Sequence, residues 1–81
     1  MSISYNGWKN RATWNIALWL GNDEGLYNLV CECATQNPRN PYAAFLRYMG
    51  PDERTPDGFK YAGRAVCRKE INHYMREMVG A

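Results

Sequence analysis

The fold is decided by one stretch near the N-terminus, Asn10-Arg11-Ala12-Thr13-Trp14-Asn15-Ile16-Ala17-Leu18-Trp19-Leu20-Gly21. Its interior holds neither Gly nor Pro, and the side chain of Asn10 can cap the free amides of a helix that begins at Arg11. Gly21 stands where a left-handed residue would end that helix after Leu20. At about 100° per residue, the apolar side chains cover nearly every side. We therefore expect a central helix that the rest of the chain covers on several sides.

The two segments that follow also repeat apolar residues at helical spacing. The second helix begins after Asn22 or Asp23, whose side-chain oxygens suit an N-cap, and it ends near residue 36. The third helix begins at Pro41, since proline is favoured at the first helical position. Gly50 and Pro51 stop it.

A loop and a last helix complete the expected architecture. Residues 51–58 hold two Pro, one Gly and four charges, which predicts an exposed loop with a turn at Asp57-Gly58. Residues 59–61 can add one short extended segment. From about Arg64 to Val79 an apolar stripe predicts a helix with a basic outer face. The sequence thus predicts an all-α fold, in which residues 1–81 form a single domain of four helices.

Composition narrows the class of protein. A chain of 81 residues, 46% hydrophobic and 14% aromatic, is too apolar for intrinsic disorder and too short for two cores. Its longest apolar run, residues 16–20, is far below the roughly 20 residues that span a bilayer, and residues 1–4 do not resemble a signal peptide. Three cysteines, an odd number, favour reduced thiols. We expect a cytoplasmic protein without a membrane partner.

Residues 5–27 carry the most specific pattern, Trp8-x-Asn10-x-x-Thr13-Trp14-Asn15-x-x-Leu18-Trp19 followed by Asn-Asp-Glu and Leu-Tyr. The pattern resembles the signature of a family of small uncharacterised proteins found in tailed phages and some bacteria. Thr55-Pro56-Asp57-Gly58 is similar to a less distinctive family feature, whereas the basic run at residues 64–69 is where we expect this chain to depart. The resemblance implies a phage-associated, mainly helical protein, and it brings no catalytic residues.

Metal and catalytic chemistry find little support. Cys31, Cys33, Cys67 and His73 are the right number of soft ligands for zinc. Two residues apart on one helix, however, Cys31 and Cys33 point about 160° apart, and Cys67 lies on the core-facing stripe. His73 with Glu77 one turn later is typical of a surface pair, and no nucleophile motif or phosphate-binding loop accompanies it. We predict no enzyme activity, no cofactor and no metal, and no small-molecule substrate is evident.

The tryptophans favour a protein partner. Trp14 and Trp19 lie about 140° apart around their helix, so one small core has little room for both together with Trp8. Because exposed aromatic residues often mark interfaces, we predict a protein-binding surface at Trp8, Trp19, Tyr27 and Arg11. The expected function is a phage-encoded accessory protein that inhibits or redirects a host protein, such as a defence effector. A homo-oligomer seam and a purely structural use of these tryptophans stay open.

Nucleic-acid binding is the alternative. The net charge of +2 permits contact with nucleic acid but is well below the strong basic excess typical of proteins that bind it. Glu70 and Glu77 dilute the positive charge, and no sequence-reading motif is present, so contacts would be weak and directed to the backbone. The candidate surface gathers the cations of the last third of the chain, Lys60, Arg64, Arg68, Lys69 and Arg76.

Overall fold

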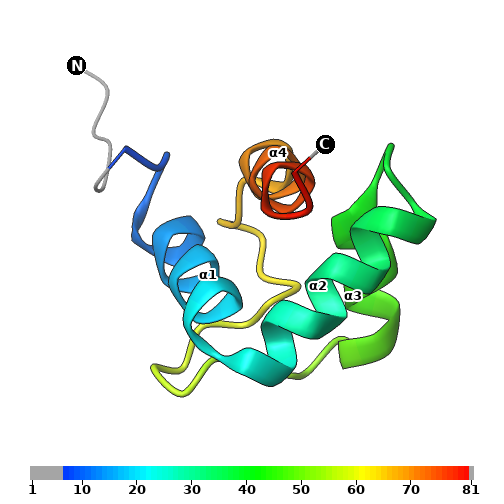
Figure 1. Ribbon diagram of the computed structural model, residues 1–81. Helices are drawn as coiled ribbons and strands as arrows, with labels where there is room; N and C mark the ends of the chain where they lie inside the picture. Colours follow the sequence, from blue (N-terminus) through cyan, green and yellow to red (C-terminus); the bar gives the residue numbers. More distant parts are fainter. Residues whose placement is uncertain (1–6, 81) are drawn as a thin grey trace.

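The computed structural model describes residues 7–80, and within them four helices follow one another along the chain (Figure 1). They are α1 (Arg11–Asn22), α2 (Glu24–Gln36), α3 (Pro41–Met49) and α4 (Arg68–Met78). No strand occurs in this part of the chain, so the predicted all-α fold is confirmed. Tyr5 and Asn6, which begin the stretch that carries the resemblance, lie outside the described residues.

Local chemistry explains most helix ends. The side chains of Asn10 and Asp23 each accept a hydrogen bond of 2.9 Å from a backbone N–H three residues later, which caps α1 and α2 as predicted. At α3 the side chain of Asn40 makes no cap bond. The left-handed φ of +85° at Gly50 ends that helix, a conformation that glycine adopts without steric cost.

Gly21 does not end α1, which corrects the sequence prediction. The helix continues through Gly21 to Asn22, and the extended backbone of Asp23 stops it. The N–H of Asp23 still donates to the carbonyl of Trp19 at 3.1 Å. A Cβ atom at position 21 would lie only 2.6 Å from the hydroxyl of Tyr74. The glycine therefore permits the close approach of α1 and α4 rather than a left-handed turn.

The last helix starts later than predicted, at Arg68 instead of near Arg64. Residues 61–67 form turns instead. The reason lies in α1, because the hydroxyl of Thr13 accepts a hydrogen bond of 2.9 Å from the backbone N–H of Cys67. This contact anchors the chain against α1 just before α4 begins.

The packing also corrects the expectation that α1 is central. Both α2 and α4 pack against all three other helices, whereas α1 contacts only α2 and α4. The connection 50–67 covers α1 on another side, since it crosses from α3 to α1 and returns to α4 (Figure 1). In it, Arg54 and Lys60 form a single antiparallel bridge, which is all that corresponds to the predicted extended segment.

The core lies between the helices and this connection. Among the helices that the structure describes, none is long and apolar enough to cross a membrane. The largest buried apolar side chains are Ile16, Leu20, Val30, Tyr42, Phe45, Tyr61, Ile71 and Met75.

Candidate functional site

Two polar residues of α1 and its cap hold the chain that enters α4. The carboxamide oxygen of Asn10 accepts from the hydroxyl of Thr13 at 2.7 Å, and the amide of Asn10 donates to the carbonyl of Ala65, also at 2.7 Å. The fully buried hydroxyl of Thr13 accepts in turn from the N–H of Cys67. Since every polar atom here has a partner, burial of these groups carries little desolvation cost.

One turn further along α1, Asn15 and Trp19 hold the loop at residues 55–58. The buried side chain of Asn15 donates to a carboxylate oxygen of Asp57 at 2.7 Å and accepts from the hydroxyl of Thr55 at 2.7 Å. The indole N–H of Trp19 donates to the same oxygen of Asp57 at 2.9 Å. These bonds from Asn15 and then Trp19 lower the pKa of Asp57 below its ordinary value of 3.8.

We call Asn10, Thr13, Asn15 and Trp19 the α1 clamp. All four belong to the pattern Trp8-x-Asn10-x-x-Thr13-Trp14-Asn15-x-x-Leu18-Trp19. Each makes a hydrogen bond to a residue of the connection 50–67, and the partner of Thr13 is the last residue of that connection, Cys67. These members of the pattern therefore act in building the fold.

The four residues predicted to bind a protein do not form one site. Arg11 and Trp19 both adjoin the loop at residues 55–59, because the guanidinium of Arg11 lies 5.7 Å from the centre of the Phe59 ring and Trp19 bonds to the loop. Tyr27 lies on α2 and is 38% exposed. Contact with the thiol of Cys31 raises the pKa of the Tyr27 hydroxyl. Trp8 packs against Tyr74 of α4 instead.

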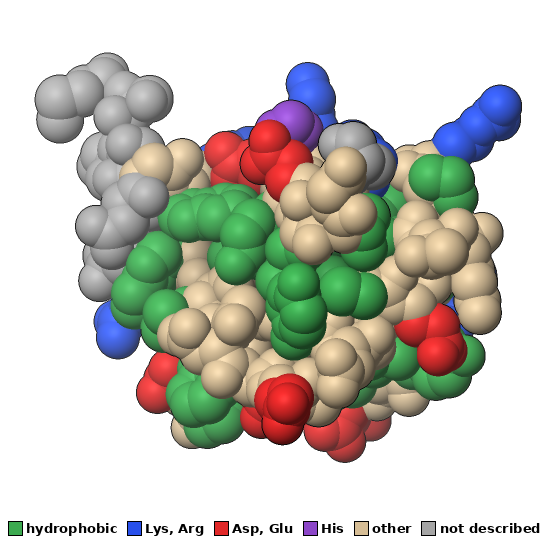
Figure 2. Space-filling model, in the orientation of Figure 1, with side chains coloured by type: hydrophobic (Ala, Val, Ile, Leu, Met, Phe, Trp, Pro, Cys, Tyr) green, Lys and Arg blue, Asp and Glu red, His purple; other side chains and the backbone are tan. Residues whose placement is uncertain are grey.

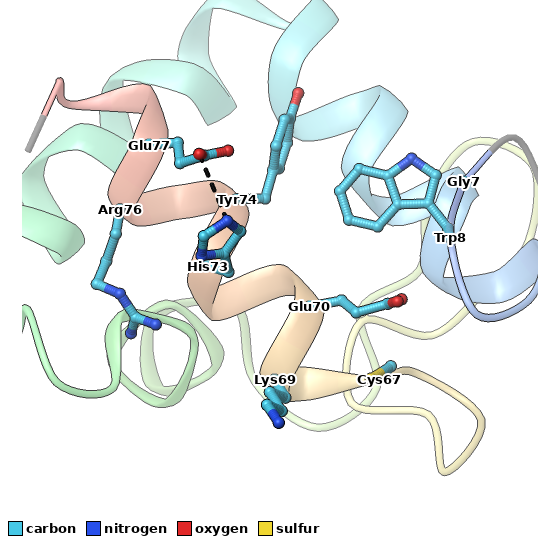
Figure 3. Close-up of a pocket in the computed structure, with 9 residues that line it drawn as sticks. All are labelled: Gly7, Trp8, Cys67, Lys69, Glu70, His73, Tyr74, Arg76 and Glu77. Atoms are coloured by element: carbon cyan, nitrogen blue, oxygen red, sulfur yellow. Dashed lines mark ion pairs between the residues drawn. The ribbon is translucent and has the colours of Figure 1, made fainter.

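Trp8 forms one wall of a cleft along α4, which we call the Trp8 cleft (Figure 3). Its ring meets that of Tyr74 edge to face, at 88° with centroids 5.2 Å apart. The backbone N–H of Lys9 donates to a carboxylate oxygen of Glu70 at 2.8 Å, which ties the segment before α1 to α4. The cleft has a volume of about 590 Å³ and is lined by Gly7, Trp8, Cys67, Lys69, Glu70, His73, Tyr74, Arg76 and Glu77.

The charged side chains of the Trp8 cleft point in different directions (Figure 3). Glu77 faces the exposed imidazole of His73, with 3.4 Å between the oxygen and the ring nitrogen. Glu70 extends toward the side of the cleft that Trp8 occupies. Arg76 turns away, and its guanidinium lies 3.3 Å from the carbonyl oxygen of Pro38 on the chain before α3. The cleft thus joins an aromatic wall to carboxylates on one helix.

Hydrophobic side chains gather on the face where α1, α2 and α4 meet (Figure 2). Acidic side chains lie beside the single histidine, His73, above this apolar area. Trp8, Tyr74 and Met78 are only partly buried and pack against the core from outside. The aromatic surface of the cleft is therefore continuous with the core.

The five cations predicted to bind nucleic acid differ in their contacts within the chain. Lys60 lies 3.7 Å from a carboxylate oxygen of Asp52 in the loop, and Arg76 donates to backbone carbonyls. Arg64, Arg68 and Lys69 are exposed, and no ion pair within the described residues involves them. Only these three leave their charge to solvent near the start of α4.

The cysteines and His73 are not brought together. Cys33 is buried, Cys31 and Cys67 are half-buried, and all three are free thiols. Within residues 7–80, no group of three His, Cys, Asp or Glu residues could hold a metal ion. His73 pairs with Glu77, as predicted, at the surface.

Three residues of interest escaped sequence reasoning. Tyr74 falls on the apolar stripe of the last helix, which predicts a core residue, although it forms a wall of the cleft. In the sequence, Glu70 only reduces the positive charge of the last helix. Its bond to the backbone of Lys9 could not be predicted, because the two residues are 61 positions apart. Tyr48 is 62% exposed and lies off the apolar stripe of α3, so its position on the helix could have predicted an exposed aromatic residue.

A family model matches nearly the whole chain. The family described as a family of unknown function (DUF7249) matches residues 1–80. No curated protein and no solved structure matches the chain.

Proposed function

We propose that this chain, which belongs to the family of unknown function DUF7249, is a phage-encoded accessory protein that binds a host protein and inhibits or redirects it. The proposal includes action in the host cytoplasm, with a defence effector as one class of target. The resemblance of the tryptophan pattern to small phage proteins supports the phage origin.

The Trp8 cleft is the single observation that carries the proposal. An indole that is only partly buried beside a tyrosine matches the composition of surfaces that bind proteins tightly, in which Trp and Tyr are enriched. The other protein-binding candidates are weaker supports. Trp19 uses its N–H within the fold, and Arg11 lies over Phe59.

A second candidate function rests on the exposed cations at the start of α4. Arg64, Arg68 and Lys69 leave their charge to solvent, so they are available to phosphate groups. Binding through them would be salt-sensitive and independent of sequence.

A capture experiment tests the two functions against each other. Tagged wild-type protein, Trp8→Leu and Arg68→Glu/Lys69→Glu are incubated with lysate of the cells that make the protein, with and without nuclease, at two salt concentrations. The protein-binding function predicts one discrete protein that survives nuclease and high salt and is lost from Trp8→Leu alone. Nucleic acid recovered at low salt and lost from the charge-reversed variant would replace it with the second function. Recovery of neither would refute both.

A further inference from the structure

We propose that the Trp8 cleft binds an arginine side chain presented by the partner protein. The inference rests on the proposed function and names the chemistry of the contact. It follows from the aromatic wall, the two carboxylates and the direction in which the cations of the cleft point.

The aromatic wall suits a flat cation. Trp8 and Tyr74 meet at 88°, so they form two walls of a corner. The indole plane faces into the cleft (Figure 3). A guanidinium stacks on such a plane, because the negative face of the ring system attracts the cation, and tryptophan attracts it most strongly.

Two carboxylates of the same helix line the cleft, Glu70 on the side of Trp8 and Glu77 across the ring of Tyr74 (Figure 3). Glu70 and Glu77 are seven residues apart on α4, which places them on one face about two turns from each other. One oxygen of Glu70 accepts the N–H of Lys9, and the other oxygen makes no hydrogen bond to a described residue. A guanidinium on the indole could donate to it through the planar fork that distinguishes arginine from lysine.

The cations of the cleft do not neutralise these carboxylates. Arg76 donates to the carbonyls of Pro38 and Arg39 at 3.3 and 3.5 Å, and Lys69 points away from Trp8 (Figure 3). Within the described residues, no lysine or arginine pairs with Glu70 or Glu77. His73 beside Glu77 adds positive charge only when it is protonated. The carboxylates are therefore available to a cation from another molecule, and a volume of about 590 Å³ admits an arginine with its flanking backbone.

The test is a titration of the isotopically labelled full chain, followed by NMR. The probe is the blocked peptide acetyl-Gly-Arg-Gly-amide, and its control contains citrulline, which has the same shape without the charge. Addition of the arginine peptide should shift the indole signal of Trp8 and the amide signals of α4 in a saturable way. The citrulline peptide should bind about tenfold more weakly, as expected for loss of one charged contact.

Matched variants locate the contact. Glu70→Gln/Glu77→Gln retains both side-chain shapes and an acceptor for Lys9, and it should weaken the arginine peptide about tenfold. Glu53→Gln, at an exposed loop position, should leave binding unchanged. Equal binding of the two peptides, or equal loss in both variants, would overturn the inference.

Its failure differs from failure of the proposed function. A partner captured through Trp8 without arginine binding overturns only the inference. Arginine binding without any captured partner overturns the proposed function.

Discussion

The residues of the α1 clamp and Trp8 of the Trp8 cleft come from one sequence pattern, but the polar groups of the two regions differ in how fully the chain satisfies them. In the α1 clamp, the side chains of Asn10, Thr13 and Asn15 donate and accept within the chain, and Thr13 and Asn15 are buried. In the Trp8 cleft, the rings are partly buried, Glu70 accepts one bond from the N–H of Lys9, and Glu77 faces the imidazole of His73.

The difference separates residues that build the fold from those to which we assign the proposed binding. The long connection 50–67 is held in two ways, since Tyr61 and Val66 are buried in the core and the clamp adds hydrogen bonds. Trp8 packs instead against Tyr74 of α4. Substitutions in the two regions should therefore have different consequences, and the largest concern the clamp.

The largest loss of stability is expected for Asn15→Ala. The change removes the two hydrogen bonds of Asn15 to Asp57 and Thr55, leaves the buried hydroxyl of Thr55 without its acceptor and opens a cavity. The free energy of unfolding should fall by about 3 kcal/mol, measured by urea denaturation. The exposed Asn28 on α2 provides the matched control, since Asn28→Ala should change stability by less than about 0.5 kcal/mol. Equal effects would mean that the clamp does not hold the loop.

Thr13→Val should cost somewhat less. Valine keeps the shape of threonine but removes the acceptor for the N–H of Cys67, so stability should fall by about 2 kcal/mol. Thr35→Val is the control, because the Thr35 hydroxyl bonds only to the carbonyl one turn earlier on an exposed face. A loss as small as that of the control would show that the chain before α4 does not need this anchor.

Acid should weaken the clamp through Asp57. Its pKa is lowered in the folded chain, so its contribution to stability is complete above its ordinary value of 3.8 and is lost as the pH falls through the folded value. Urea midpoints measured from about pH 5 to about pH 2 should therefore fall less steeply in Asp57→Asn than in the wild type. The exposed loop residue Asp52 supplies the control, Asp52→Asn. Identical pH dependence of Asp57→Asn and wild type would contradict the role of Asp57.

The smallest change in stability is expected in the cleft. Glu70→Gln/Glu77→Gln should alter the free energy of unfolding by less than about 0.5 kcal/mol, because glutamine keeps the bond to Lys9 and surface charges contribute little. Urea denaturation measures this directly. A loss comparable to that of Thr13→Val would place these glutamates among the residues that build the fold.

Sequence reasoning recovered the helices because their caps are local. Asn10, Asp23, Pro41 and Gly50 act on the residues next to them, and their positions follow from the chain. It missed the start of α4 because the bond between Thr13 and Cys67 spans 54 positions. It also placed α1 at the centre, since the pattern of one helix does not reveal that an irregular connection covers one side.

The candidate site was less predictable for the same reason. Trp8 was singled out as a binding residue, which stays a prediction, whereas its neighbours Tyr74 and Glu70 were interpreted as core and diluting charge. Trp19 was predicted to lie on a protein-binding surface, with a purely structural use left open, and its bond to Asp57 was missed because it joins positions 38 apart. Its part in protein binding stays a prediction, as does that of Tyr27.

The most direct test compares Trp8→Leu with Trp19→Phe in the same capture experiment, at conditions where both variants are equally folded by urea denaturation. Leucine keeps apolar contact with Tyr74 but removes the indole plane from the cleft, whereas phenylalanine removes the bond to Asp57 from the clamp. We predict that Trp8→Leu loses the captured protein and Trp19→Phe retains it. Retention by Trp8→Leu together with loss by Trp19→Phe would contradict the assignment of binding to the cleft and of fold-building to the clamp.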